Sequence, residues 1–238
     1  MARIFITGSS DGIGLVAARS LIAQGHQVTL HARNQQRANE AQKAAPGAEG
    51  VLVSDISTVA GMKNLASEAN KTGAFDAVIH NAGVGYSQPF RKTEDGIATV
   101  FARLIYTSSG LHSGGDGSLN DVTWTSGRPW NGFQAYSDSK LHDVILAHAV
   151  ARRWKDVESN AVDPGWVATK MGGMSAPGTV DAGADTLSYL AEGKESASGK
   201  LFKNRRPVRS HDAAGKVDVQ EKFLQICEKL SGVSFPEH

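Results

Sequence analysis

Short apolar stretches alternate with longer stretches in which apolar residues recur every three or four positions. The short stretches are typical of buried strands, and the longer ones are typical of helices with one apolar face. Glycine or proline follows several of the longer stretches, where a helix would end. The pattern predicts strands over residues 3–7, 28–32, 51–53, 75–80, 104–107, 160–162 and 200–202. It predicts helices over 13–24, 35–45, 59–71, 134–154, 180–191 and 217–230, part of a helix over 93–103, and a long loop over 110–131.

Alternation of strands and helices favours an α/β fold. A parallel sheet needs a crossover between neighbouring strands, and helical crossovers cover both of its faces. We therefore expect a doubly wound, mostly parallel sheet in a single domain over 1–238. The segment from about 170 to 200 carries Gly172-Gly173 and Pro177-Gly178 and suits a mobile lid over a substrate.

Composition narrows the class of protein. The 238 residues include 25 basic and 24 acidic side chains, a net charge of +1, with no basic run that would indicate nucleic acid binding. Cys227 is the single cysteine, so the sequence predicts no disulfide framework and no cysteine-rich metal site. No apolar run has membrane-spanning length, and no charged leader precedes the first strand. These features favour a cytoplasmic protein with no membrane span and no bound metal.

A glycine-rich loop joins the first strand to the first helix. Glycine allows a sharp turn and a close approach of the backbone to a pyrophosphate, and the helix that follows offers unpaired N–H groups. A tight turn without a ligand is the alternative. The position between strand and helix favours a dinucleotide site formed by Gly8, Ser10, Asp11, Gly12, Ile13 and Gly14.

The end of the second strand indicates which dinucleotide is bound. NAD-binding proteins often place an acid there, whereas His31-Ala32-Arg33-Asn34 contains none. A guanidinium can bind a 2′-phosphate with two hydrogen bonds. We therefore expect Arg33 to select NADP(H), with NAD(H) the less favoured cofactor; a solvated surface arginine is the alternative.

Tyr136 and Lys140 are the strongest candidates for acid–base chemistry. Residues four apart in a helix lie on one face. An ammonium about 4 Å from a phenolate stabilises it by roughly 1 to 4 kcal/mol. Tyr136 could then give a proton to a carbonyl oxygen or take one from an alcohol.

These motifs together resemble the short-chain dehydrogenase/reductase family. The glycine loop resembles the family's Thr-Gly-x-x-x-Gly-x-Gly segment, Asn81-Ala82-Gly83 resembles its Asn-Ala-Gly segment, and Tyr136 to Lys140 resembles its Tyr-x-x-x-Lys. The resemblance extends from Arg3 to Lys170 and is nearest to the retinol-dehydrogenase-like branch. It implies a Rossmann-type fold and an enzyme that transfers a hydride between a nicotinamide and a carbonyl or alcohol substrate.

The resemblance also implies roles for single residues. Tyr136 and Lys140 would contact the cofactor as well as act in catalysis. The further cofactor-binding residues that it implies are Asp55, Ile56, Asn81, Ala82, Gly83, Pro164, Gly165, Val167 and Thr169.

A serine at the end of the fifth strand should complete the catalytic group. Thr107-Ser108-Ser109-Gly110 resembles the family's Val-Ser-Ser, whose second serine is catalytic, so we expect Ser109 to hydrogen-bond the substrate oxygen. Ser108 is the second choice, and Thr123 in the long loop is the third. His112 in the same loop is expected to be solvated.

The chain departs from the family between the fourth and fifth strands. The family has a long helix there that carries an asparagine, and residues 84–103 contain no asparagine and are too few. Either this crossover is shortened near Ala102, or the sequence omits a stretch. Because family dimers often pair through this helix, a homodimer or homotetramer is in doubt. A catalytically impaired NADP(H)-binding sensor is the alternative function; the retained serine, tyrosine and lysine favour the enzyme.

Overall fold

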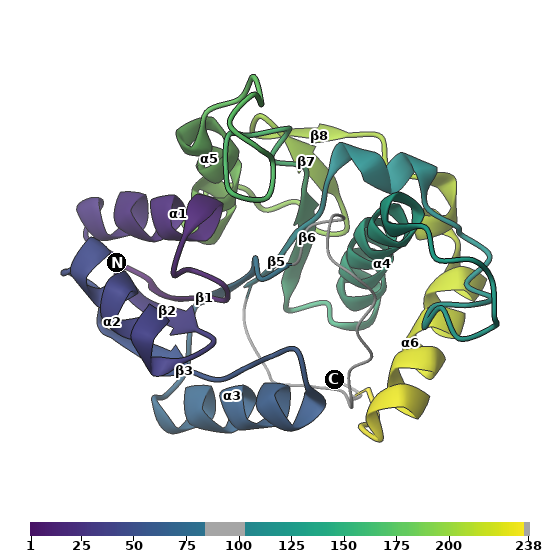
Figure 1. Cartoon of the computed structure of the whole chain (residues 1–238), viewed down its shortest axis with the longest axis horizontal. Helices are drawn as coiled ribbons and strands as arrows, with labels where there is room; N and C mark the ends of the chain where they lie inside the picture. Colours follow the sequence, from purple (N-terminus) through teal and green to yellow (C-terminus); the bar gives the residue numbers. More distant parts are fainter. Residues whose placement is uncertain (84–102, 236–238) are drawn as a thin grey trace.

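The chain folds around one eight-stranded sheet, as a computed structural model shows (Figure 1). The structure describes residues 1–83 and 103–235. The strand order is β3-β2-β1-β4-β5-β6-β7-β8, and every neighbouring pair is parallel except β7 and β8. This is the doubly wound, mostly parallel sheet that the sequence predicted. Because the chain starts in the middle of the sheet and reverses direction after β3, the switch point lies between β1 and β4, where ligands of such sheets bind.

The elements follow the predicted alternation closely. The strands are β1 Arg3–Ile6, β2 Gln27–Ala32, β3 Gly50–Val53, β4 Ala77–His80, β5 Arg103–Thr107, β6 Glu158–Val162, β7 Leu201–Lys203 and β8 Arg206–Val208. The helices are α1 Gly12–Ala23, α2 Gln35–Ala44, α3 Val59–Lys71, α4 Gly132–Arg153, α5 Val180–Ala191 and α6 Val217–Ser231, with short 3₁₀ turns η1 Gly110–Gly114 and η2 Asp212–Gly215.

Local chemistry fixes several helix ends. Asn34 and Thr58 each accept a backbone N–H of the first turn through their side-chain oxygen, at 2.9 and 3.0 Å. Such caps satisfy donors that have no partner inside the helix. Gly232 ends α6 in the left-handed conformation that glycine adopts without strain.

Two apolar cores lie on opposite faces of the sheet. Successive strand residues point to opposite faces, so Phe5 faces one core while Ile4 and Ile6 face the other. Helices α3, α4 and α6 cover the first face, and α1, α2 and α5 cover the second (Figure 1). Both faces of the central strands are therefore buried, as a parallel sheet requires.

Three details differ from the sequence prediction. Strand β8 was not predicted. Within the long loop predicted over 110–131, residues Gly110–Gly114 form a 3₁₀ turn. Arg103, which was predicted to end a helix that starts at 93, is the first residue of β5; the rest of that helix, and the possible break near Ala102, lie outside the described residues.

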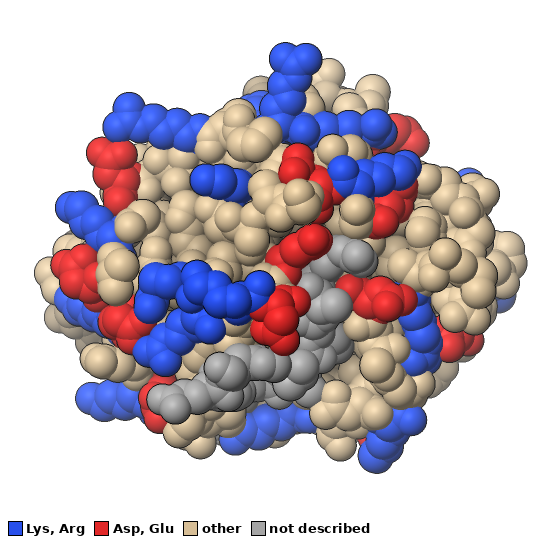
Figure 2. All heavy atoms as spheres, turned by 180° about the vertical axis from the view of Figure 1, so that it is seen from behind, with Lys and Arg blue, Asp and Glu red and all other residues tan. Residues whose placement is uncertain are grey.

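The surface carries both signs of charge. On the face shown in Figure 2, lysine and arginine side chains are interspersed with aspartate and glutamate. In the part of the chain that the structure describes, no helix combines the length and apolar character needed to cross a bilayer.

Candidate active site

The glycine loop and the end of β4 are in direct contact. Gly8 has a φ of +62°, and a Cβ added to it would lie 2.8 Å from the Cα of Ala82. A Cβ added to Gly14 would lie 2.4 Å from Nδ2 of Asn81. Both glycines are therefore required by space, and the predicted Asn81-Ala82-Gly83 segment packs against the predicted loop.

Asn81 and Thr7 join the two segments by hydrogen bonds. Nδ2 of Asn81 donates to the carbonyl oxygens of Thr7 and Gly8, both at 3.1 Å. Oγ1 of Thr7 accepts the backbone N–H groups of Asn81 and Ala82 at 3.0 and 3.1 Å. Asn81 and Thr7 thus hold the carboxyl ends of β1 and β4 together.

His31 also supports the loop, a role that was not predicted. Its Nδ1 accepts the N–H of Gly8 at 3.0 Å, so Nε2 carries the proton and donates to the carbonyl of Ser54 at 2.9 Å. The residue is 2% exposed. Burial lowers the pKa of His31 below its usual value, and the Ser54 carbonyl opposes that shift only in part. The sequence signal that could have indicated this role is the position of a histidine within a strand expected to be buried.

Protonation of His31 is expected to destabilise the protein in acid. The neutral form is favoured in the folded state, so its contribution to stability is complete above pH 6.5, the ordinary value, and is lost as the pH falls through the lowered value. Urea unfolding at pH 7.5 and pH 5.5 should show a larger loss of unfolding free energy for the wild type than for His31→Gln. Equal losses would show that His31 is not responsible.

Asp11 is the N-cap of α1 and forms ion pairs with two basic side chains beside the glycine loop. Its Oδ1 accepts the N–H of Gly12 at 2.9 Å, and its Oδ2 pairs with Lys170 and with Arg37. The hydrogen bond from Lys170 is the main reason why the pKa of Asp11 is lowered. Arg37 also donates to the carbonyl oxygen of Ser10 at 3.2 Å.

A second arginine, Arg37, therefore lies near the predicted cofactor loop in addition to the predicted Arg33. Arg33 is exposed after β2, and its charge contributes to the lowered pKa of Asp55, after the hydrogen bonds from Ser57. Arg37 lies one helical turn later, against the glycine loop. Its spacing from Arg33 was visible in the sequence, but its contact with the loop was not.

Asp55 and Ile56, predicted to bind the cofactor, follow β3. Asp55 is exposed and accepts the N–H of Ser57 at 3.0 Å. Ile56 is only partly buried, and its side chain packs against the core under α3 and α4. Of the two side chains, that of Asp55 is therefore the more accessible to a ligand.

Tyr136 and Lys140 face each other on α4. Nζ of Lys140 lies 5.7 Å from the centre of the Tyr136 ring. It also donates to the carbonyl oxygen of Thr107, the last residue of β5, at 2.8 Å. A Cβ added to Gly83 would lie 3.9 Å from the same nitrogen. The predicted pair is therefore at the carboxyl edge of the sheet, beside the end of β4.

The two candidate serines differ in how their hydroxyl protons are used. Ser108 is 2% exposed, and its hydroxyl donates to the carbonyl of Lys140 at 2.7 Å. Ser109 is less buried, and its oxygen accepts the N–H of Leu111 at 3.3 Å, which leaves its proton for another acceptor. Thr123 is exposed, and its hydroxyl bonds that of Thr125 at 2.8 Å.

The segment after β6 lies against the glycine loop. Asp163 is buried, and it accepts hydrogen bonds from the N–H of Gly165 at 2.9 Å and from Nζ of Lys203 at 2.8 Å. Gly165, directly after Pro164, has a φ of +79°. The segment then brings Thr169 to Gly12, where an added Cβ would lie 3.7 Å from Cγ2 of Thr169.

Two of the segment's side chains differ in exposure. Val167 is 5% exposed, and a Cβ added to Gly178 would lie 3.1 Å from its Cγ1. Trp166 is 59% exposed. Val167 therefore packs into the protein, while Trp166 faces solvent beside it.

The prediction that His112 is solvated is wrong. His112 is 6% exposed, and its Nδ1 donates to the carbonyl oxygen of Ser109 at 2.7 Å. The turn of η1 brings the ring back over the serine. His112 therefore fixes the backbone of the predicted catalytic serine.

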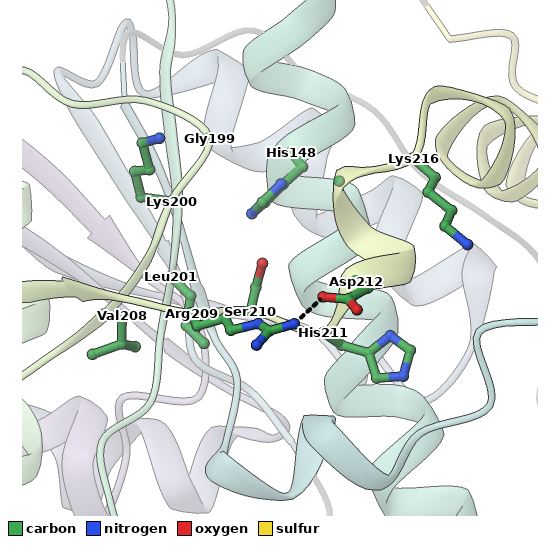
Figure 3. Close-up of a pocket in the computed structure, with 11 residues that line it drawn as sticks. His148, Gly199, Lys200, Leu201, Val208, Arg209, Ser210, His211, Asp212 and Lys216 are labelled. Carbon is green, nitrogen blue, oxygen red and sulfur yellow. Dashed lines mark hydrogen bonds and ion pairs between the residues drawn. The ribbon is translucent and has the colours of Figure 1, made fainter.

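A cavity of about 460 Å³ lies elsewhere, between α4, β7 and the segment before α6 (Figure 3). His148, Lys200 and the ion pair of Arg209 with Asp212 are among its lining residues. None of the predicted site residues lines it. The contacts of the glycine loop with β4, and of Lys140 with β5, place the candidate site at the switch point of the sheet instead.

Comparison with known proteins agrees with this geometry. Residues 2–178 match the family model described as short chain dehydrogenase. The chain is 46% identical to an uncharacterized oxidoreductase of Emericella nidulans and 45% identical to the short-chain dehydrogenase chry4 of Gibberella zeae, with 99% of each chain covered in both cases. The first alignment spans 261 positions, more than this chain has, so that relative carries residues with no counterpart here.

Two weaker matches are a more distant sequence relative and a solved structure with the same fold. Human retinol dehydrogenase 14 is 26% identical over 97% of this chain and 86% of its own. A crystal structure of an uncharacterized protein from Mycobacterium paratuberculosis superposes with a TM-score of 0.81 at 22% identity, covering 99% of this chain and 95% of the other. Because the family model matches residues 2–178 and two relatives share 46% and 45% identity over 99% of its length, the chain belongs to the short-chain dehydrogenase family of oxidoreductases.

Proposed function

We propose that the protein is an NADP(H)-dependent oxidoreductase that transfers a hydride between the nicotinamide and a carbonyl or alcohol substrate, with Tyr136 as general acid and base. The observation that supports this most directly is the placement of Lys140. Its ammonium lies 5.7 Å from the Tyr136 ring and is bound to the end of β5. The same edge of the sheet carries the glycine loop.

The residues of the loop fit a dinucleotide. Gly8 and Gly14 leave no room for a Cβ, so the backbone and Asn81 approach closely there. Asp11 takes the N–H of Gly12, which leaves the N–H groups of Ile13 and Gly14 for a phosphate at the helix N-terminus. Thr169 lies over Gly12 through its methyl group, and its hydroxyl oxygen accepts the N–H of Gly172 at 3.0 Å, which keeps the hydroxyl proton for a phosphate.

Each catalytic side chain has one task in this proposal. A bound NADPH would supply the hydride. Ser109 donates its free proton to the substrate oxygen, and Tyr136 gives its phenolic proton to the same oxygen as negative charge develops there. Lys140 stabilises the resulting phenolate. In the reverse direction Tyr136 takes the proton from the alcohol.

In this proposal, Arg33 and Arg37 contact the 2′-phosphate of the cofactor and so favour NADP(H) over NAD(H). We expect Arg33→Ala and Arg37→Ala each to weaken NADPH binding about 10- to 100-fold, the loss expected for one charge-assisted contact. In Arg33→Ala, NADH binding should change less than about threefold, because NADH has no 2′-phosphate for this contact. In Arg37→Ala, NADH binding should fall as well, but by a smaller factor than NADPH binding, because Arg37 also contacts Ser10 and Asp11 of the glycine loop. Quenching of protein fluorescence would give both dissociation constants.

Arg19→Ala is the matched control, since Arg19 is exposed on α1. Loss of NADPH and NADH affinity by equal factors in the Arg33 and Arg37 variants would contradict recognition of the 2′-phosphate. A loss in only one variant would identify the arginine that makes the contact.

The substrate is expected to be bulky and apolar. Phe133, Trp166 and Met174 are 53%, 59% and 87% exposed, on α4 and on the segment after β6 that leaves the candidate site. Such large exposed apolar side chains commonly mark binding surfaces. The name of the relative retinol dehydrogenase 14 points to an apolar alcohol as well.

The function is tested by following NADPH absorbance with a panel of aromatic and aliphatic aldehydes and ketones. Turnover of at least one compound is expected. Tight NADPH binding without turnover of any compound would favour the alternative, an NADP(H) sensor that no longer catalyses. The cytoplasmic location, the single domain over 1–238 and the assembly state remain predictions.

A further inference from the structure

The ammonium of Lys140 is bound by a second group on its own helix. It donates to Oδ2 of Asp143 at 2.9 Å as well as to the carbonyl of Thr107 at 2.8 Å. The side chains of Lys140 and Asp143 are 13% and 32% exposed. The pair of Lys71 with Glu68 has the same three-residue spacing on α3, but its side chains are 67% and 43% exposed. The side chains of the pair on α4 are therefore less exposed to water than those of the pair on α3.

Burial makes the partner necessary. A charged amine that loses its water is unstable unless an opposite charge and hydrogen bonds replace that water. Burial pushes the pKa of Lys140 down, but the charge of Asp143 and its hydrogen bond, helped by Tyr136, push it up and outweigh burial. The pKa of Lys140 is therefore raised.

Other titratable groups around the pair carry no competing charge. Tyr106 of β5 lies near Asp143, and burial first, then the Asp143 charge, raise its pKa, so the phenol stays neutral. His80 of β4 stacks on Tyr106 with the ring centres 5.0 Å apart, and burial lowers the pKa of His80 to about 4. Within residues 1–83 and 103–235, Asp143 is the acid that acts on Lys140.

On α4 itself, His142 is a further titratable neighbour of Asp143. Burial lowers its pKa, and the charges of Asp138, Asp143 and Asp116 oppose that shift. At neutral pH His142 is therefore uncharged, so it does not compete with Lys140 for the carboxylate of Asp143.

We propose that Asp143 is a positioning residue that keeps Lys140 charged and fixed between Tyr136 and the end of β5. The proposal rests on the proposed function, because it assigns the charge state on which the phenol depends. An ammonium has three donors. With two of them bound to Thr107 and Asp143, the third remains for the ribose of the cofactor or for the phenolate.

The kinetic test compares Asp143→Asn with Glu68→Gln, which makes the same change in the exposed pair on α3. The substrate is the aldehyde of the panel that the wild type turns over fastest. We expect Asp143→Asn to lower kcat about tenfold at pH 7, because Lys140 loses the charge-assisted hydrogen bond that fixes it beside Tyr136, with KM changed less than about threefold. Its activity should also be lost at a lower alkaline pH than in the wild type, while Glu68→Gln behaves as the wild type.

Asp143→Glu keeps the charge and should recover the alkaline limit of the wild type. If Asp143→Asn leaves both kcat and the pH profile unchanged, the proposal is wrong. Equal defects in the Asn and Glu variants would likewise contradict it, since they would indicate a packing effect rather than a charge effect.

A second measurement is independent of activity. Lysines labelled with ¹³C at Cε can be titrated by NMR, and the Lys140 signal is identified by its loss in Lys140→Arg. Asp143→Asn should move the Lys140 titration to lower pH, and an unchanged midpoint would overturn the proposal. If the wild type turned over no substrate, the proposed function would fail, while this titration would still decide the role of Asp143.

Discussion

Replacement of Tyr136 by phenylalanine is expected to remove turnover and to leave NADPH binding almost unchanged. The variant keeps the ring beside Lys140 but loses the hydroxyl that exchanges a proton with the substrate oxygen. General acid–base catalysis contributes about 100- to 10,000-fold, so kcat should fall by a factor in that range. The dissociation constant of NADPH should change less than about threefold, because the glycine loop is intact.

Tyr189→Phe is the matched control for this experiment. Tyr189 lies on α5, and its hydroxyl donates to the carbonyl of Lys194 at 3.3 Å. The same loss of a hydroxyl there should leave kcat unchanged. Residual activity near that of the wild type in Tyr136→Phe, or a loss of NADPH binding that accounts for the whole defect, would show that Tyr136 is not the acid.

Gly14→Ala is expected to damage both stability and cofactor binding. The added methyl group would lie 2.4 Å from Nδ2 of Asn81 and 2.8 Å from the carbonyl oxygen of Gly8. Overpacking typically costs about 1 to 3 kcal/mol, and each kcal/mol lowers the melting temperature by roughly 2 to 4 °C in a chain of this size. NADPH affinity should fall at least about tenfold, because displacement of Asn81 releases the glycine loop.

Gly50→Ala makes the same chemical change without the collision. Gly50 begins β3, where an added Cβ meets nothing within 4 Å. Alanine costs less conformational entropy than glycine in a strand, so stability should stay equal or rise by up to about 1 kcal/mol. Similar melting temperatures for the two variants would show that the space beside Asn81 is not critical.

The elements of the fold were predictable because local signals and tertiary packing agree. Buried strands such as β1 carry a continuous apolar run, here Ile4 to Ile6, and amphipathic spacing marks α3 at its observed bounds. The hairpin of β7 and β8 was missed because its turn contains no glycine. Asn204 and Arg205 both have positive φ, 51° and 60°, which the type I′ form of a two-residue hairpin turn requires. Only the antiparallel pairing makes that conformation of an arginine understandable.

The candidate site was predictable where a motif fixes both position and contact. Tyr136 and Lys140 face each other as helical spacing required. Arg37, His31 and Asp143 were missed, because their importance depends on contacts between segments or on burial that spacing alone does not give. His112 was assigned to solvent for the same reason: a polar loop does not reveal that a turn folds its ring back onto the backbone.

The short edge strand β8 also limits how a strand of another molecule could extend this sheet. In β8, Pro207 lies opposite Phe202 in the pairing with β7 and has no N–H to offer to a further strand. The strand has three residues, and all are exposed. A neighbouring molecule that tried to extend the sheet there would gain few backbone hydrogen bonds. Association of copies of this chain is therefore expected to use helical faces rather than a continuous intermolecular sheet through β8.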